Sequence, residues 1–112
     1  MEIINKPWGK EEVLEINNNY MLKRLTMFKG HRCSLQFHNK KKETILVISG
    51  VLKIIYGDDP KNLNFQLFKP GESFTLDPKV IHRMEAIEES IYIEASTPEM
   101  DDVVRLVDDY NR

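Results

Sequence analysis

The stretch SLQFHNKKKETILVISG, residues 34–50, determines how this chain is interpreted. In a β-strand, side chains two residues apart share a face, so Gln36 and His38 point the same way. Glu43 then begins a second alternating run of apolar residues. If the two runs pair as a hairpin, a carboxylate, an imidazole and an amide oxygen converge on one point. Burying these groups without partners costs several kcal/mol, so they require a cation or a network of hydrogen bonds.

The rest of the chain predicts an all-β domain. Short runs rich in β-branched and aromatic residues alternate with turn signals, which is typical of a sandwich or small barrel. The expected strands are residues 19–28, 34–38, 44–49, 51–56, 65–68, 73–76 and 90–96. Residues 97–110 differ, because Thr97 can cap a helix, Pro98 fits its first position and apolar residues follow at helical spacing. We therefore expect a single domain, residues 1–112, with a short C-terminal helix or turn.

Bulk composition narrows the functional classes. A chain of 112 residues with a formal net charge of −2 gives no reason to expect nucleic acid or an anionic membrane as a partner. The lone cysteine, Cys33, excludes an internal disulfide and fits a reducing compartment. The N-terminal segment lacks the apolar block of a signal peptide. These observations predict a soluble, cytoplasmic protein.

Two segments resemble the motifs of the cupin superfamily. The spacing from Gly30 through Gln36, His38 and Glu43 to Gly50 resembles the first motif, with glutamine in place of its first histidine. Residues 71–86, GESFTLDPKVIHRMEA, resemble the second motif. Within the superfamily the chain is similar to the type II phosphomannose isomerase branch and its small stand-alone relatives. That similarity is carried by residues 6–9 (KPWG), 34–38 (SLQFH), 81–83 (IHR) and 96–112.

The resemblance implies a jelly-roll barrel with a metal ion inside it. Its ligands would be Gln36, His38, Glu43 and His82. Zinc, iron, manganese and nickel all suit such a donor set. The chain departs from the larger isomerases at residues 44–45, where Thr-Ile replaces a His-Trp pair, and at its last three residues, Tyr-Asn-Arg.

Two further residues are candidates for proton transfer. Glu94 shares a strand face with Tyr92 and Ser96, and it is a candidate general base if that face is inward. If the face is outward, Glu94 is a solvated charge. Lys23 is expected to face the barrel, as lysine does in related small cupins, and the alternative is a surface lysine.

Arginines are the candidates for contacting a phosphate. Arg83 follows His82 and its guanidinium could reach a phosphate at the barrel mouth. Neighbouring residues of a strand point in opposite directions, so the orientation of Arg83 remains open. Arg105 is the second candidate. His31 is interpreted as a loop histidine, and residues 39–42 (NKKK) as a solvated turn.

Three functions are compatible with these residues. The first is a metal-dependent aldose–ketose isomerase acting on a sugar phosphate such as mannose 6-phosphate. The second is a non-catalytic metal- or carbohydrate-binding cupin associated with sugar-nucleotide metabolism, since one fold hosts many functions. The third is an iron-dependent oxygenase. A homodimer is expected, because exposed edge strands need to be covered.

Overall fold

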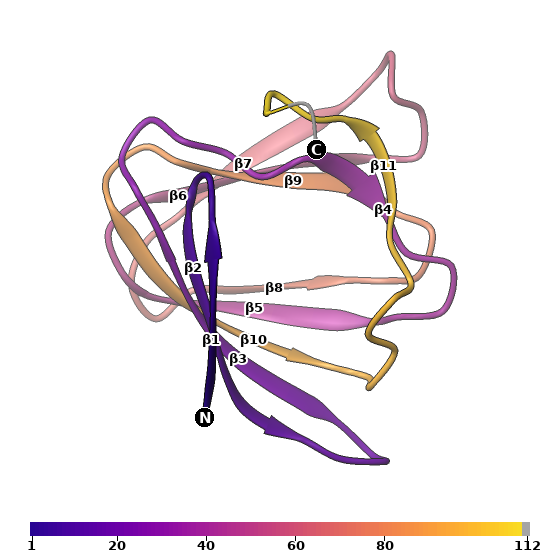
Figure 1. Ribbon diagram of the computed structural model, residues 1–112. Helices are drawn as coiled ribbons and strands as arrows, with labels where there is room; N and C mark the ends of the chain where they lie inside the picture. The colour runs from indigo at the N-terminus through magenta and orange to yellow at the C-terminus, as the bar shows by residue number, and fades with distance from the viewer. Residues whose placement is uncertain (111–112) are drawn as a thin grey trace.

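The computed structural model describes residues 1–110 and consists of two antiparallel sheets that face each other across a barrel (Figure 1). Their strands are β1 Glu2–Lys6, β2 Gly9–Ile16, β3 Met21–Met27, β4 Leu35–Phe37, β5 Glu43–Ser49, β6 Leu52–Gly57, β7 Asn64–Phe68, β8 Ser73–Leu76, β9 Ile81–Ala86, β10 Ser90–Ser96 and β11 Val104–Val107. One sheet has the order β1-β2-β3-β10-β5-β8 and the other β11-β4-β9-β6-β7. The all-β jelly-roll prediction is confirmed.

Of the short C-terminal helix or turn that was expected, the helix does not form within residues 97–110. Residues 1–110 contain no helix, and hence none that could cross a membrane. Instead, β11 pairs antiparallel with β4, whose edge offers unpaired backbone groups to a short strand. Thr97, expected to cap a helix, accepts the backbone N–H of Lys42 through its hydroxyl oxygen at 3.0 Å. Asn111 and Arg112, which belong to the C-terminal resemblance, lie outside the described residues.

The hairpin considered for the stretch 34–50 does not form. β4 pairs with β9 and β11, whereas β5 pairs with β10 and β8 in the other sheet. His38 and Glu43 therefore approach each other across the barrel rather than along one ladder. The sequence analysis also assigned no strand to residues 2–16, which form β1 and β2.

Alternation along the strands builds the barrel interior. On β5, Glu43, Ile45 and Val47 are buried while Leu46 and Ile48 are exposed. The buried apolar cluster consists of Trp8, Leu25, Met27, Cys33, Ile45, Val47, Leu52, Ile54, Phe68, Leu76, Met84, Ala86 and Tyr92. Apolar burial of this kind is the dominant favourable contribution to folding.

The turns are arranged so that one end of the barrel carries the site. Gly50, in the β5–β6 turn, has a φ of 84°, and a Cβ there would lie 2.2 Å from the carbonyl oxygen of Glu89. Only glycine fits this position. At the opposite end lie the β4–β5, β8–β9 and β10–β11 connections (Figure 1).

The expected homodimer stays a prediction.

Candidate metal centre

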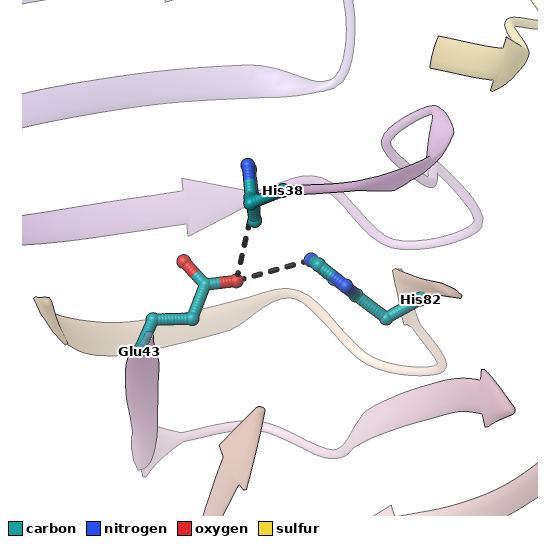
Figure 2. Close-up of side chains that lie close together, drawn as sticks. All are labelled: His38, Glu43 and His82. Atoms are coloured by element: carbon teal, nitrogen blue, oxygen red, sulfur yellow. Dashed lines mark ion pairs between the residues drawn. The ribbon is translucent and has the colours of Figure 1, made fainter. Parts of the chain in front are cut away.

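Three side chains meet at the end of the barrel that carries the β4–β5, β8–β9 and β10–β11 connections (Figure 2). His38 follows β4, Glu43 begins β5 and His82 is the second residue of β9. The Oε1 atom of Glu43 lies 3.0 Å from Nε2 of His82 and 3.7 Å from Nε2 of His38. One potential ligand atom from each residue lies within 4.8 Å of the others, and all three residues are buried.

Both imidazoles are held in the orientation of a metal ligand. Nδ1 of His82 donates a hydrogen bond to the Val80 carbonyl at 2.9 Å, and Nδ1 of His38 donates to the carbonyl of Asp102. These bonds select the tautomer in which Nε2 carries a lone pair. Within residues 1–110, neither Nε2 of His82 nor Oε1 of Glu43 makes a hydrogen bond, despite their proximity. A divalent cation would satisfy both atoms, so the donor set fits a metal ion.

The charge on Glu43 is stabilised by its neighbours. Burial raises the pKa of this carboxyl, but the imidazoles of His38 and His82 and the ammonium of Lys41 outweigh burial and leave the pKa well below its usual value. For His38, burial lowers the pKa, and the Glu43 carboxylate more than reverses this effect. The Glu43 carboxyl is therefore ionised at neutral pH, as an oxygen ligand must be, and a metal ion would compete with a proton on His38.

Gln36, the fourth predicted ligand, lies beside this cluster. It pairs with His82 across the β4–β9 ladder. Together with His38 and Glu43 it lines a pocket at this end of the barrel, which is described below. Its Oε1 accepts a hydrogen bond from the Ser34 hydroxyl at 3.1 Å. An amide oxygen has a second lone pair, so this bond is compatible with metal ligation. Its role as a ligand stays a prediction.

A pocket of about 400 Å³ opens next to the three residues. This volume lies within the range of small-molecule sites. Its charged lining residues balance, with the cationic Lys6, Lys23, Lys41 and Arg105 facing the carboxylates of Glu11, Glu43, Glu94 and Asp101. The pocket therefore suits a small, polar ligand.

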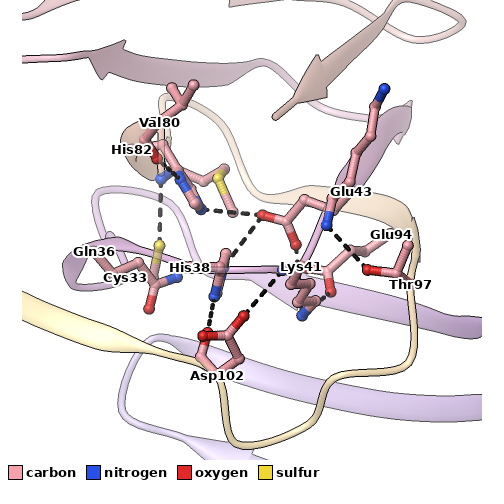
Figure 3. Close-up of polar contacts among 12 residues, drawn as sticks. Cys33, Gln36, His38, Lys41, Glu43, Val80, His82, Glu94, Thr97 and Asp102 are labelled. Atoms are coloured by element: carbon pink, nitrogen blue, oxygen red, sulfur yellow. Dashed lines mark hydrogen bonds and ion pairs between the residues drawn. The ribbon is translucent and has the colours of Figure 1, made fainter. Parts of the chain in front are cut away.

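Lys41 and Glu94 form a buried ion pair in this pocket (Figure 3). The ammonium lies 3.1 Å from Oε2 of Glu94 and 3.6 Å from Oε2 of Glu43. Burial raises the pKa of Glu94, and the charge of Glu43 raises it further, against the effect of Lys41. Burial lowers the pKa of Lys41, but the two carboxylates outweigh burial. The face containing Glu94 points inward, which is the orientation that a general base requires.

Sequence analysis missed Lys41. It interpreted residues 39–42 as a solvated turn, and Lys40 and Lys42 are indeed exposed. Lys41 precedes Glu43 by two residues, so continuing the period-2 pattern of β5 back into the turn places both on one face. This continued alternation is the sequence pattern that could have identified Lys41 as a residue of the site.

Lys23 lies on the inward face of β3 and lines the pocket. Its ammonium is 3.1 Å from Oε2 of Glu11, a pocket residue that sequence analysis also missed. In the β10–β3 ladder, Lys23 is the partner of Glu94. The two residues predicted to transfer protons are thus neighbours.

The two predicted phosphate ligands lie in different places. Arg83 is buried outside the pocket lining, and its guanidinium donates to the Cys33 carbonyl at 3.0 Å and contacts Asp109 at 3.5 Å. Alternation along β9 directs it away from His82, which corrects its predicted role as a phosphate ligand. Arg105, on β11, is exposed at the pocket. His31 stays outside the site, and its ring contacts only the nearby Lys29 carbonyl among the hydrogen bonds of residues 1–110.

Known sequences show where this chain belongs. The family model described as "Mannose-6-phosphate isomerase C-terminal" matches residues 2–108. A mannose-1-phosphate guanylyltransferase of Escherichia coli (strain K12) is 31% identical over 97% of this chain and 23% of its own length. The xanthan biosynthesis protein XanB of Xanthomonas campestris pv. campestris (strain B100) is 27% identical, with the same coverage of 97% and 23%. The chain thus spans about a quarter of the length of these relatives.

Solved structures agree on the fold. An RmlC-like cupin from Shewanella frigidimarina superposes with a TM-score of 0.77 and 22% identity, covering 89% of this chain and 86% of that chain. The Bacillus subtilis oxalate decarboxylase, which has Mn(II) centres, gives a TM-score of 0.80 at 17% identity, covering 95% of this chain and 30% of that chain. At these identities the likeness shows the fold alone.

Proposed function

Because the chain belongs to the mannose-6-phosphate isomerase C-terminal family, we propose that it is a metal-dependent domain that binds a sugar phosphate in sugar-nucleotide metabolism. The supporting observation is that three buried potential metal ligands, His38, Glu43 and His82, lie next to a polar pocket whose charged lining includes the exposed Arg105. The mannose-1-phosphate guanylyltransferase relative favours a sugar-phosphate ligand, and the buried set of two imidazoles and a carboxylate favours a divalent ion.

Different residues would contact different parts of the sugar phosphate. A bound divalent cation would supply Lewis-acid polarisation to sugar oxygens. Arg105, exposed on β11, would bind the phosphate with its planar guanidinium. Lys23 and the Lys41–Glu94 pair would hydrogen-bond to sugar hydroxyls inside the pocket. These contacts would bind a sugar phosphate without catalysing a reaction on it.

The second candidate is an aldose–ketose isomerase, favoured by the buried Glu94 carboxylate in the pocket. Burial raises the pKa of Glu94, which suits a group that accepts and returns a proton. Glu94 would take the proton from the carbon next to the carbonyl and deliver it to the former carbonyl carbon, while a proton moves between the two oxygens. An iron-dependent oxygenase has less support, because dioxygen requires no cationic side chains.

Calorimetry on metal-loaded and EDTA-treated protein tests the binding function. Mannose 6-phosphate and mannose 1-phosphate should bind only to loaded protein, and mannose alone should bind more weakly. Arg105→Met should weaken sugar-phosphate binding about 10-fold or more, since a charged hydrogen bond contributes about 1.5–3 kcal/mol. Lys61→Met, at an exposed lysine outside the pocket, is the matched control. Equal binding with and without metal would contradict the proposal.

Deuterium exchange separates the two candidates. The loaded protein is incubated with mannose 6-phosphate in deuterated water, and the carbon next to the carbonyl is followed by NMR. Mannose 1-phosphate, whose blocked anomeric carbon gives no carbonyl form, is the control. An isomerase incorporates deuterium at that carbon of mannose 6-phosphate, and both Glu94→Gln and Lys23→Met should slow the exchange. Binding without exchange supports the binding domain and excludes the isomerase.

A further inference from the structure

Asp102 occupies a particular place in the fold. It lies in the segment of residues 97–103, which crosses from β10 in one sheet to β11 in the other at the metal-site end of the barrel (Figure 1). Its carboxylate accepts three backbone hydrogen bonds from the turn after β4, from Asn39 at 2.9 Å, Lys40 at 2.6 Å and Lys41 at 3.0 Å. A carboxylate bonded to several N–H groups holds a turn firmly, because each bond is charge-assisted.

The same residue also contacts a metal ligand. The main-chain oxygen of Asp102 accepts the Nδ1–H of His38 (Figure 3). His82 is held differently, by the carbonyl of Val80, only two residues away in its own loop. The orientation of His82 is therefore a local property, whereas that of His38 depends on a residue 64 positions further along the chain.

We propose that Asp102 is a positioning residue of the metal centre, through which the segment of residues 97–103 holds His38 with its Nε2 lone pair toward Glu43. The inference rests on the metal site of the proposed function. The carboxylate fixes the 39–41 turn against the segment, and the carbonyl fixes the imidazole tautomer. Partners of this kind, behind the ligands, typically change metal affinity by about 10- to 100-fold when removed.

Fixing the turn of residues 39–41 also affects the pocket. The backbone N–H of Lys41 donates one of the three hydrogen bonds to the Asp102 carboxylate, and the ammonium of Lys41 lies between Glu43 and Glu94. The segment also supplies Met100 and Val103 to the pocket. Asp102 thus connects the wall of the pocket with the metal ligands.

Metal affinity provides the first test. Asp102→Ala should weaken Zn²⁺ and Co²⁺ binding by about 10- to 100-fold in calorimetry. Asp102→Asn should show a smaller loss, because its amide oxygen still accepts N–H groups but without the charge. Asp58→Asn is the matched control, since it removes the same charge from an exposed aspartate outside this pocket that has no side-chain hydrogen bond or ion pair within residues 1–110. It should bind like the wild type.

Two spectroscopic readouts separate positioning from a loss of fold. The visible absorption of bound Co²⁺ reports ligand geometry and should change in Asp102→Ala and not in Asp58→Asn. In metal-free protein, imidazole ¹⁵N shifts should show the Nδ1–H tautomer of His38 in the wild type and a mixture in Asp102→Ala, with His82 as the internal reference. If the alanine variant does not fold, the metal affinity, the Co²⁺ absorption and the imidazole ¹⁵N shifts are all measured on Asp102→Asn instead.

The outcomes are distinguishable. If the wild type binds metal, and Asp102→Ala binds equally well with unchanged His38 signals, this inference is wrong and the proposed function stands. If the wild type binds no divalent ion, both the proposed metal site and the inference fail. A loss of affinity confined to Asp102 variants, together with an altered His38 tautomer, supports the inference.

Discussion

The inward faces of single strands change character from one end of the barrel to the other. On β9 the inward residue at the metal-site end is His82, followed by the apolar Met84. On β5, Glu43 is followed by Ile45 in the same way. Both halves have the same backbone geometry and the same alternation. The difference lies only in which side chains occupy the last inward position, so chemistry is added at the strand ends.

The two halves differ in their contribution to stability. Each fully buried large apolar side chain in the cluster contributes about 1.5–3 kcal/mol. Buried charges at the other end cost desolvation energy, which the Lys41–Glu94 pair offsets only in part. The apolar half is thus expected to determine folding, and the polar half is expected to determine ligand binding. Mutations in the two halves should have separable effects.

The largest expected effect is on metal binding. His82→Ala removes one of three converging ligands, so the affinity for divalent ions should fall by more than about 100-fold, the upper end of effects seen for supporting residues. The strands should remain folded, because the apolar half is intact. Metal content after purification and calorimetry measure the loss. His31→Ala, at a histidine outside the site, should bind metal normally. Retained binding in a His38→Ala/His82→Ala double variant would place the site elsewhere.

In the apolar half, Leu52→Ala should reduce the free energy of unfolding by about 2–5 kcal/mol, because it leaves a cavity. Leu52 is fully buried, with 0% of its surface exposed. Urea denaturation of metal-free protein measures the change. Phe65→Ala on β7, at a residue 61% exposed, should stay within about 0.5 kcal/mol. If Leu52→Ala weakened metal binding as much as His82→Ala, the two halves would not be separable.

A smaller effect is expected from pH. Burial lowers the pKa of His38, but the Glu43 carboxylate leaves it above its ordinary value. In metal-free protein, protonated His38 stabilises the fold at acidic pH, and this contribution is lost as pH rises through the raised pKa. An ion requires the neutral imidazole, so stabilisation by metal has the opposite trend. The difference in Tm between loaded and stripped protein should grow between about pH 5 and 8. A constant or shrinking difference would contradict this assignment.

Local periodicity was sufficient to predict which side chains share a strand face. The alternation in residues 43–49 and 90–96 groups Glu43 with Ile45 and Glu94 with Tyr92, because the period of two is a property of the strand itself. Both orientations of the Glu94 face were left open by the sequence, and the structure places this face inward. The pairing of strands was not predictable in this way. The short link between β4 and β5 was compatible with a hairpin, and the fact that these strands lie in different sheets depends on the whole topology.

The turns and the C-terminal segment show where prediction from sequence stops. Lys41 could be distinguished from Lys40 and Lys42 only by extending the alternation of β5 into the turn, and the turn itself is held by a residue 61 positions further along. Thr97 was expected to cap a helix, and Asp102 lies in the same segment. They do cap backbone N–H groups, but those of residues 39–42 rather than of a helix of their own. The sequence showed that these side chains suit the capping of backbone N–H groups. It did not show which N–H groups they would cap, because those groups lie in a distant turn.

The division of the ligands between the two sheets has a kinetic consequence. His38 and His82 extend from the sheet that contains β4 and β9, and Glu43 extends from the sheet that contains β5. An ion held by all three would join the sheets at one end of the barrel, so they could not separate there until a ligand was released. The time that the ion stays bound would then set a lower limit on the lifetime of the folded barrel, and chelators would shorten that lifetime even where they change the equilibrium little.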